Sequence, residues 1–302
     1  MLPLVTHPAY SYPFPAKHRF PMQKFGLLHA YLQSLGIATR TNTLRPGRCQ
    51  PGLLTLAHDE AYVGRFVSGQ LTHAEVRRMG LPWSEGLKLR TCISPAGTLL
   101  AAHYALEYGV ACHLAGGTHH AHRDFASGFC IFNDLAITAR AMLAHTRVRK
   151  VLIFDVDVHQ GDGTARILEG DTQAFTCSVH CEKNFPVRKA ASDLDINLPV
   201  AMGDDAYLSV VSHTFAKLLR EERPDLVLYD AGVDVYADDP LGLLNISEAA
   251  IAARDRDVLR QAREAGVPIA TVIGGGYDRD QQALARRHAL CVEQAAMEFA
   301  GI

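Results

Sequence analysis

The chain lacks a long apolar run. None of the apolar segments in its 302 residues approaches the roughly 20 residues that a membrane-spanning helix needs. Residues 1–7 also lack the basic stretch and apolar core of a secretion signal. These absences predict a cytoplasmic protein with no membrane partner.

The chain also lacks any block of charge of one sign. Its 30 Lys and Arg residues nearly balance its 32 Asp and Glu residues, which gives a formal net charge of -2 at pH 7. Segments that bind nucleic acid through its phosphates usually stand out as runs of Lys and Arg. Direct binding of DNA or RNA is therefore not expected.

Cysteine is sparse and scattered. The seven cysteines are odd in number, and no two form a Cys-x-x-Cys pair. This argues against a disulfide framework and against a zinc ribbon. Cys177 and Cys181 flank His180 at the end of an expected buried strand, so small core residues explain them better than metal ligands do.

From about residue 94 onward the sequence alternates short apolar runs with longer helical patterns. The runs are almost continuously apolar, as in strands that are buried on both faces of a parallel sheet. The pattern predicts an α/β protein. The expected strands cover residues 110–114, 151–156, 175–179, 226–229 and 267–273, and the expected helices cover residues 134–145, 205–220 and 247–265.

The first third of the chain is less regular. Helix-like stretches at residues 21–35 and 59–68 accompany short expected strands at residues 37–41 and 53–57. No repeat, linker or low-complexity tract marks a boundary, and α/β folds of this length commonly surround one sheet. Residues 1–302 are therefore expected to form a single domain.

Four polar motifs each follow an expected strand. In open parallel sheets, ligands bind beyond the carboxyl ends of the strands, so these motifs should meet at one rim of the sheet. The motifs are Gly116-Gly117-Thr118-His119-His120, Asp155-Val156-Asp157-Val158-His159, Asp230-Ala231-Gly232-Val233-Asp234 and Gly274-Gly275-Gly276-Tyr277.

One part of these motifs has the chemistry of a metal site. Asp157 and His159 are two residues apart where a strand runs into a loop, so their side chains leave the same side of the chain. Asp234, at the end of another strand, would add a third ligand. Three protein ligands with an open position suit a catalytic zinc ion. A hydrogen-bonded structural pair is the alternative for Asp157 and His159 alone.

Two further carboxylates flank this segment. Asp155 and Asp162 could each accept a hydrogen bond from an imidazole of the tandem histidines His119 and His120, which would fix the tautomer of each histidine. Asp162 could instead serve only as a helix N-cap. His122 also stands nearby, and a solvated or loop-packing role is expected for it.

Taken together, the four motifs in this order resemble those of the histone deacetylase family of the arginase/deacetylase superfamily. The resemblance covers roughly residues 90–280, and residues 77–83 look most like the small class IV deacetylases and their bacterial relatives. It implies a three-layer α/β/α domain with a mainly parallel, eight-stranded sheet. It also implies one zinc ion held by Asp157, His159 and Asp234.

The resemblance further implies a role for each site residue. His120 would be the general base and acid, and His119 would act mainly by its charge. Asp155 would pair with His119 and Asp162 with His120, while Tyr277 would donate a hydrogen bond to the developing oxyanion. Gly128, Phe129 and Phe185 would line an apolar tunnel for the substrate. Asp155 and Ser178 would contribute to a monovalent cation site, with K⁺ as the candidate ion.

The function expected from the resemblance is hydrolysis of acyl groups, acetyl first and longer chains as a variant, from lysine side chains of proteins. One alternative is a deacylase of small acylated amines such as acetylpolyamines. A binuclear manganese hydrolase of the arginase type is disfavoured, because the positions where it needs further carboxylates hold Gly161 and Tyr236. A catalytically idle acyl-lysine reader is disfavoured as well, because every expected catalytic position is occupied.

Overall fold

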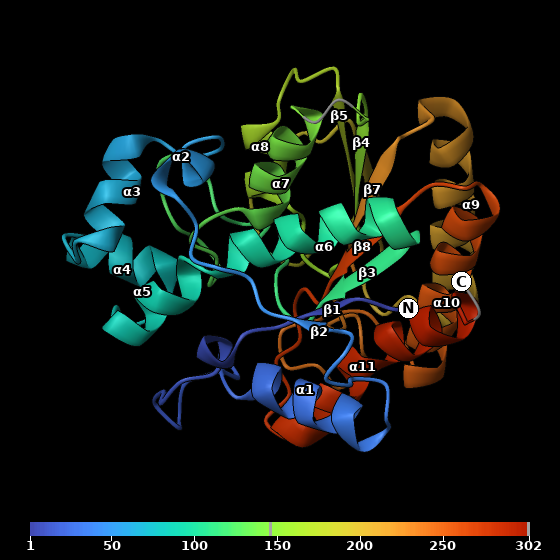
Figure 1. The fold of residues 1–302 in the computed structure, drawn as a ribbon, viewed down its shortest axis with the longest axis horizontal. Helices are drawn as coiled ribbons and strands as arrows, with labels where there is room; N and C mark the ends of the chain where they lie inside the picture. The colour runs from blue at the N-terminus through green and yellow to red at the C-terminus, as the bar shows by residue number, and fades with distance from the viewer. Residues whose placement is uncertain (145–146, 301–302) are drawn as a thin grey trace.

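The computed structural model describes residues 1–144 and 147–300. Within these residues eight strands form one sheet in the order β2-β1-β3-β8-β7-β4-β5-β6, and every neighbouring pair is parallel (Figure 1). The strands are β1 (Leu4–Val5), β2 (Thr43–Leu44), β3 (Val110–His113), β4 (Val151–Asp155), β5 (Ala174–Cys181), β6 (Leu194–Leu198), β7 (Leu226–Asp230) and β8 (Ile269–Val272).

Helices occur in every connection between consecutive strands except that between β5 and β6, as is usual for a parallel sheet. A short 3₁₀ helix, η1 (Pro8–Tyr10), follows β1. The α-helices are α1 (Lys24–Ser34), α2 (Pro51–Leu54), α3 (Glu60–Val67), α4 (His73–Met79), α5 (Glu85–Thr91), α6 (Ser94–Tyr108), α7 (Asp134–Leu143), α8 (Asp162–Ile167), α9 (Asp204–Glu222), α10 (Glu248–Glu264) and α11 (Gln281–Glu298).

Two groups of helices enclose the sheet. In one group α6 contacts β3 and β8, and α7 contacts α6 and β4. In the other, α1, α11, α10 and α9 contact one another in that order (Figure 1). Phe154 of β4 packs on Phe215 of α9 with ring centroids 4.8 Å apart. The four central strands β3, β8, β7 and β4 are buried along their whole length, which explains their unbroken apolar sequence.

The sequence predicted the central elements correctly. Each of the five strands expected after residue 94 overlaps an observed strand, and the eight-stranded parallel sheet is confirmed. The helices expected at residues 205–220 and 247–265 correspond to α9 and α10, and those expected at 21–35 and 59–68 correspond to α1 and α3. The helix expected at 134–145 corresponds to α7, and its last expected residue lies outside the described residues.

Two of the expected strands are wrong. Residues 37–41 form no strand, and residues 53–57 overlap α2, which begins at Pro51. A proline at the first helical position favours this helix start. The edge strand β2 and its neighbour β1 are two residues each, and β1 pairs with both β2 and β3. Such pairing depends on residues far apart in the chain, and the sequence predicted none of β1, β2 and the other edge strand, β6.

The four polar motifs meet at one rim because β3, β8, β7 and β4 are neighbours and end together. Each motif begins at or just after the carboxyl end of one of these strands. In the register of β4 with β7, Asp155 lies opposite Asp230. The shared rim therefore brings carboxylates and imidazoles together from segments more than 100 residues apart in the sequence.

Three observations bear on the expectations from composition. No helix in the described residues is both long enough and apolar enough to span a membrane. All seven cysteines are buried and free of disulfide bonds, as expected. Both groups of candidate metal ligands in the described part of the chain consist of His and Asp alone.

Candidate active site

The expected metal ligands converge. One ligand atom from each of Asp157, His159 and Asp234 lies within 4.8 Å of the other two, and all three residues are buried. His159 Nδ1 lies 3.0 Å from Asp157 Oδ1 and 3.1 Å from Asp234 Oδ2. The loops that follow β4 and β7 thus place two carboxylate oxygens and one imidazole nitrogen around a single point.

The electrostatics of this cluster favour a bound cation. Burial, and then the charge of Asp157, raises the pKa of Asp234 to about 7. Burial opposes a charged imidazole at His159, but the two carboxylates outweigh it and raise the pKa of His159 to about 10. Buried carboxylates are stable only with a compensating positive charge. One nitrogen and two oxygen donors form a set that divalent transition metals such as zinc accept, so the residues fit a metal ion.

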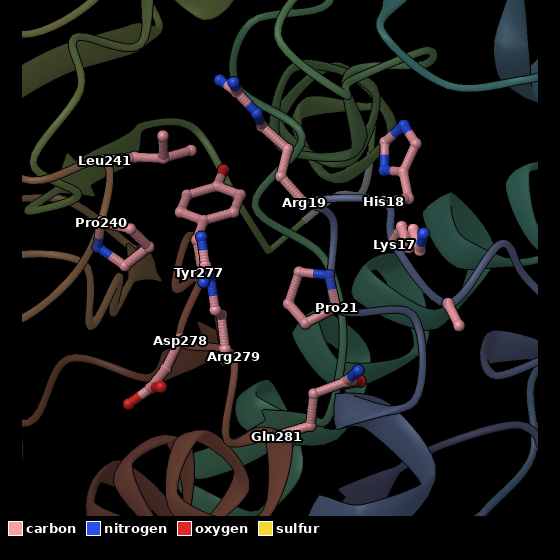
Figure 2. Close-up of a pocket in the computed structure, with 11 residues that line it drawn as sticks. Lys17, His18, Arg19, Pro21, Pro240, Leu241, Tyr277, Asp278, Arg279 and Gln281 are labelled. Atoms are coloured by element: carbon pink, nitrogen blue, oxygen red, sulfur yellow. The ribbon is translucent and has the colours of Figure 1, made fainter.

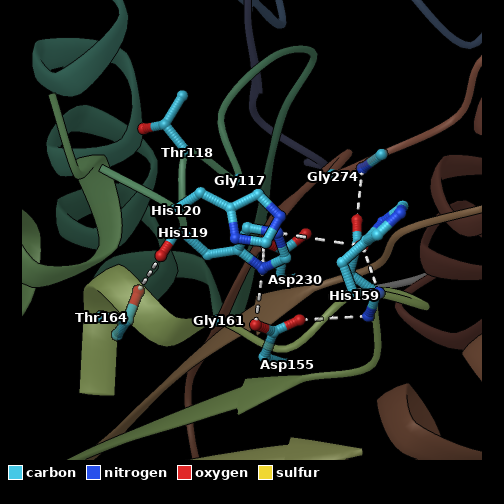
Figure 3. Close-up of polar contacts among 12 residues, drawn as sticks. Gly117, Thr118, His119, His120, Asp155, His159, Gly161, Thr164, Asp230 and Gly274 are labelled. Atoms are coloured by element: carbon cyan, nitrogen blue, oxygen red, sulfur yellow. Dashed lines mark hydrogen bonds and ion pairs between the residues drawn. The ribbon is translucent and has the colours of Figure 1, made fainter. Parts of the chain in front are cut away.

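The tandem histidines are each held by a carboxylate. His119 Nδ1 lies 2.7 Å from Asp155 Oδ2 (Figure 3). His120 Nδ1 lies 2.7 Å from Asp162 Oδ1. These are the partners that the resemblance implies. Asp162 is also the first residue of α8, but its side chain is directed at His120 rather than capping that helix.

The surroundings of the two imidazoles shift their pKa values in opposite directions. Burial lowers the pKa of His119, but the carboxylates of Asp155 and Asp157 overcome this and hold the pKa of His119 well above its usual value. Burial, and then the neighbouring charge of His119, lowers the pKa of His120 to about 4. The carboxylates thus favour the charged form of His119, while burial and the charge of His119 favour the neutral form of His120, which suits an electrostatic role for the first and proton transfer for the second.

The first residue of α7 holds the loop that carries His119 and His120. Asp134, the first residue of α7, accepts hydrogen bonds from the backbone N–H groups of Gly117 and Thr118 at 3.2 and 2.7 Å. Gly128 lies against the other side of His120, and a Cβ atom on Gly128 would come within 2.5 Å of His120 Cδ2. Glycine is therefore required at position 128 for His120 to occupy its place.

The glycine loop after β8 closes the site from the opposite side. Gly275 N–H donates to Asp157 Oδ2 at 2.6 Å, and a Cβ on Gly275 would lie 2.0 Å from Asp234 Oδ2. Tyr277 N–H donates to Asp239 Oδ2 at 2.8 Å. The loop contacts two expected metal ligands directly and presents Tyr277 next to them, so the three glycines allow a close approach that larger residues would prevent.

Tyr277 is positioned to donate a hydrogen bond. Burial, followed by the charge of Asp157, holds the pKa of Tyr277 well above 10, so the phenol keeps its proton. Its ring centroid lies 6.1 Å from that of His159 and 5.8 Å from that of Phe129. The phenol thus shares one pocket with the metal cluster and with the expected tunnel wall.

That pocket has a volume of about 620 Å³. Gly128, Phe129 and Phe185 line it together with His120, His159 and Tyr277. The Phe185 ring meets the His120 ring edge-on at 4.9 Å, and 44% of the Phe185 surface is exposed. The expected tunnel residues therefore flank the catalytic candidates at the open end of the site.

Two other sequence-based assignments have different outcomes. Ser178 lies opposite Asp155 in the register of β5 with β4, but its hydroxyl is paired with His180 Nδ1 at 3.0 Å, and the cation site stays a prediction. His122 is not merely a solvated or loop-packing residue, because its Nε2 lies 3.1 Å from Asp162 Oδ2.

Sequence reasoning missed three buried polar residues around the site. Lys24 Nζ donates to the backbone oxygens of Gly274 and Gly276 at 3.3 Å. Asp239 holds the Tyr277 backbone. Asp230 lies with Asp155 beside His119, and neither of its carboxylate oxygens has a hydrogen-bond partner in the described residues (Figure 3). Of these, only Asp230 carried a signal, because it stands at a strand end within a recognised motif.

Comparison with known proteins identifies the family. The histone deacetylase domain model matches residues 18–294. The chain belongs to the histone deacetylase family. Membership supports a hydrolase activity of the deacetylase type, and it agrees with the sequence resemblance.

This histone deacetylase family member is also similar to individual proteins. It is 47% identical over 288 residues to an uncharacterized protein of Picosynechococcus, a match that covers 95% of this chain and 96% of that protein. It is 30% identical over 270 residues to Histone deacetylase 2 of Arabidopsis thaliana, covering 86% of this chain and 70% of that protein. A crystal structure of an HDAC homologue complexed with SAHA superposes with a TM-score of 0.81 at 21% identity, covering 99% of this chain and 88% of that chain, and this likeness shows the fold.

Proposed function

We propose that this protein is a zinc-dependent amidohydrolase that removes acetyl groups, and longer acyl groups as a variant, from lysine side chains. The observation that carries the proposal is the joint placement of three elements in one pocket. These are a buried metal-type cluster, two histidine–carboxylate pairs and a protonated tyrosine. Membership of the histone deacetylase family supports the same reaction.

In this proposal Asp157, His159 and Asp234 hold the metal ion. When bound, zinc supplies a Lewis acid that polarises the amide carbonyl and makes water a better nucleophile. His120 takes a proton from the attacking water through Nε2, since its Nδ1 is engaged by Asp162. His119, held cationic by Asp155, stabilises negative charge as it develops.

The remaining residues act on the substrate. Tyr277 donates its phenolic proton in a hydrogen bond to the carbonyl oxygen as that oxygen gains charge. Phe129 and Phe185 exclude water around the aliphatic stem of the acyl-lysine. An imidazole then returns a proton to the leaving amine, so the reaction consumes one water and releases a carboxylate and a free amine.

We also propose the other parts of the sequence-based assignment. A single catalytic domain over residues 1–302 is supported by β1 and β2, which join the same sheet as the later strands. K⁺ binding near Asp155 and Ser178, class IV likeness through residues 77–83 and a cytoplasmic location remain predictions. Of the class IV-like segment, Arg78, Met79 and Gly80 line the pocket.

The test combines metal analysis with turnover. Purified protein should contain about one zinc ion per chain, consistent with three protein ligands. It should deacetylate an acetyl-lysine reporter peptide and lose activity on treatment with a chelator, with recovery when zinc is returned. SAHA, the ligand of the solved homologue, should inhibit it. A fully metal-loaded protein that hydrolyses no acylated amine would refute the proposal, and two metal ions per chain would favour the binuclear alternative.

A further inference from the structure

A second cavity of about 590 Å³ opens beside the candidate active site (Figure 2). Arg19, Pro240, Leu241 and Tyr277 line both this cavity and the pocket that contains His120. The two spaces share a wall at the mouth of the site. A substrate whose acyl group enters the pocket can therefore extend into the flanking cavity.

This shared mouth is positively charged. Lys17, Arg19 and Arg279 line the flanking cavity, and Arg19, Arg78 and Lys183 line the pocket. Among the described residues that line either space, Asp278 is the only carboxylate. The whole chain has a formal net charge of -2, so this concentration of cations is local rather than a general property.

The single carboxylate is already engaged. Asp278 Oδ2 accepts hydrogen bonds from both Arg287 amino groups at 3.5 and 3.4 Å, and its Oδ1 accepts the Asp280 N–H at 2.9 Å. In Figure 2 the Asp278 carboxylate points away from Tyr277.

Arg19 lines both spaces, and Arg279 lines the flanking cavity together with Tyr277. In the view of Figure 2 they lie on either side of the Tyr277 ring. Both side chains are exposed, and within the described residues neither forms an ion pair with a carboxylate. Lys183 differs, because it lies 3.8 Å from Glu182. Two unpaired guanidinium groups therefore remain available to a ligand.

We propose that this mouth selects acylated amines that carry an anionic group, with Arg19 and Arg279 binding a carboxylate or phosphate while the acyl group occupies the pocket. The proposal rests on the proposed deacylase function. Guanidinium groups recognise such oxyanions by paired, charge-assisted hydrogen bonds. The same residues would repel a polycation such as an acylpolyamine, so the charge of the mouth separates two substrate classes that the sequence left open.

The test uses substrates that differ only in charge. One arm compares acetyl-lysine peptides with Glu, Gln or Lys at both positions beside the acetyl-lysine. A second arm compares Nα-blocked Nε-acetyl-lysine as its free carboxylate and as its carboxamide, and includes acetylputrescine as a small cation. The first arm detects an anion on a flanking residue, and the second detects an anion on a small molecule.

The expected result is a higher kcat/KM for the anionic member in at least one arm. Each exposed ion pair should contribute about a two- to fivefold preference over the neutral member, and most of the effect should appear in KM. The preference should shrink at about 0.5 M salt, because the Debye length, beyond which exposed charges are screened, is then well below about 10 Å. Cationic substrates should be the slowest in both arms.

Variants assign the effect to the two arginines. Arg19→Gln and Arg279→Gln should each lower the ratio of kcat/KM between anionic and neutral substrates, and Arg19→Glu should reverse the preference. Arg286→Gln removes the same charge from an exposed position on α11 outside both linings, and it should leave the ratio as in the wild type.

Failure of this inference is distinct from failure of the proposed function. Turnover of all substrates with equal kcat/KM, or a preference for the cationic members, would overturn the charge selection and leave the deacylase proposal intact. Absence of turnover on every substrate, with metal bound, would overturn the deacylase proposal and this inference with it. A preference for anions that survives loss of both arginines would overturn the assignment to Arg19 and Arg279.

Discussion

His122 and His120 bind opposite oxygens of one carboxylate. His120 Nδ1 lies 2.7 Å from Asp162 Oδ1, and His122 Nε2 lies 3.1 Å from Asp162 Oδ2. Burial raises the pKa of Asp162, but the hydrogen bonds from both histidines prevail and hold it well below its usual range. The carboxylate is therefore ionised and accepts from both rings. His122 also stacks on Phe125, with centroids 4.2 Å apart, so its ring has a fixed orientation.

This arrangement makes His122 a positioning residue for the candidate base. His122→Phe keeps a flat ring against Phe125 but removes one hydrogen bond to Asp162. Loss of a hydrogen bond to a charged group costs about 1.5–3 kcal/mol at most, so kcat should fall by about tenfold or somewhat more while KM changes little. Steady-state kinetics on an acetyl-lysine peptide measure both parameters.

Two variants test whether the hydrogen bond itself is responsible. His122→Gln retains a donor at the end of its side chain and should recover part of the lost kcat. His73→Phe makes the same change at an exposed position of α4 and should behave as the wild type. Equal kcat values for His122→Phe and the wild type would show that Asp162 needs only His120.

The metal cluster gives a prediction that is independent of substrate. Asp157→Ala, His159→Ala and Asp234→Ala should each lose metal and activity together, because two remaining ligands make an incomplete site. Elemental analysis of the purified variants measures zinc per chain, and circular dichroism checks that each variant is folded. A variant that keeps full zinc occupancy would remove its residue from the ligand set.

Asp230→Asn is the matched control for this series. Asp230 is as deeply buried as Asp234 and comes from the same motif, yet it belongs to the neighbouring group with His119 and Asp155. The Asn variant should therefore keep its zinc. Loss of metal on this change would show that the second His/Asp group takes part in binding.

How much of this site the sequence predicts depends on where each residue stands. His119, Asp157 and Asp234 were found because each follows an apolar strand, and the ends of parallel strands meet at one rim. Lys24 and Asp239 were not found, because a helix and a loop bring them to the glycine loop only in the folded chain. Nothing in the local sequence around Lys24 indicates that its ammonium group is buried. Nor does it indicate that this group donates to a carbonyl oxygen 250 residues later in the chain.

The fold shows the same division. The central strands were predicted because burial on both faces makes their sequences continuously apolar. The first two strands have no such pattern, since each is two residues long and depends on its neighbours in the sheet. His122 lies between these cases: its position beside the tandem histidines was noted, but its contact with Asp162 depends on the turn of the loop.

The two histidines should differ in their effect on turnover. His120→Ala should lower kcat by about 10²–10⁴-fold, the usual contribution of general acid–base catalysis, and it should retain zinc. His119→Ala should be less damaging, because its charge rather than its proton transfer is lost. Rapid-quench or continuous assays of the two variants at matched metal content measure the difference. A larger loss for His119→Ala would exchange the two roles.

Tyr277 should act only as charge develops on the carbonyl oxygen. Its pKa is held well above 10 by burial and then by the charge of Asp157, so the phenol remains a donor at neutral pH. A donor beside the metal site stabilises the tetrahedral state more than the ground state. Tyr277→Phe should therefore keep its zinc, its fold and most of its affinity for SAHA.

The kinetic effect should be much larger than the binding effect. Loss of one oxyanion donor typically costs about 10²–10³-fold in kcat, so Tyr277→Phe should be severely slowed with KM changed far less. Tyr236→Phe, on the loop after β7 but outside the pocket lining, is a matched control and should turn over normally. Near-normal kcat in Tyr277→Phe would mean that the Gly-Gly-Gly-Tyr loop serves packing alone, because the metal ion and His119 would then stabilise the oxyanion without a phenolic donor.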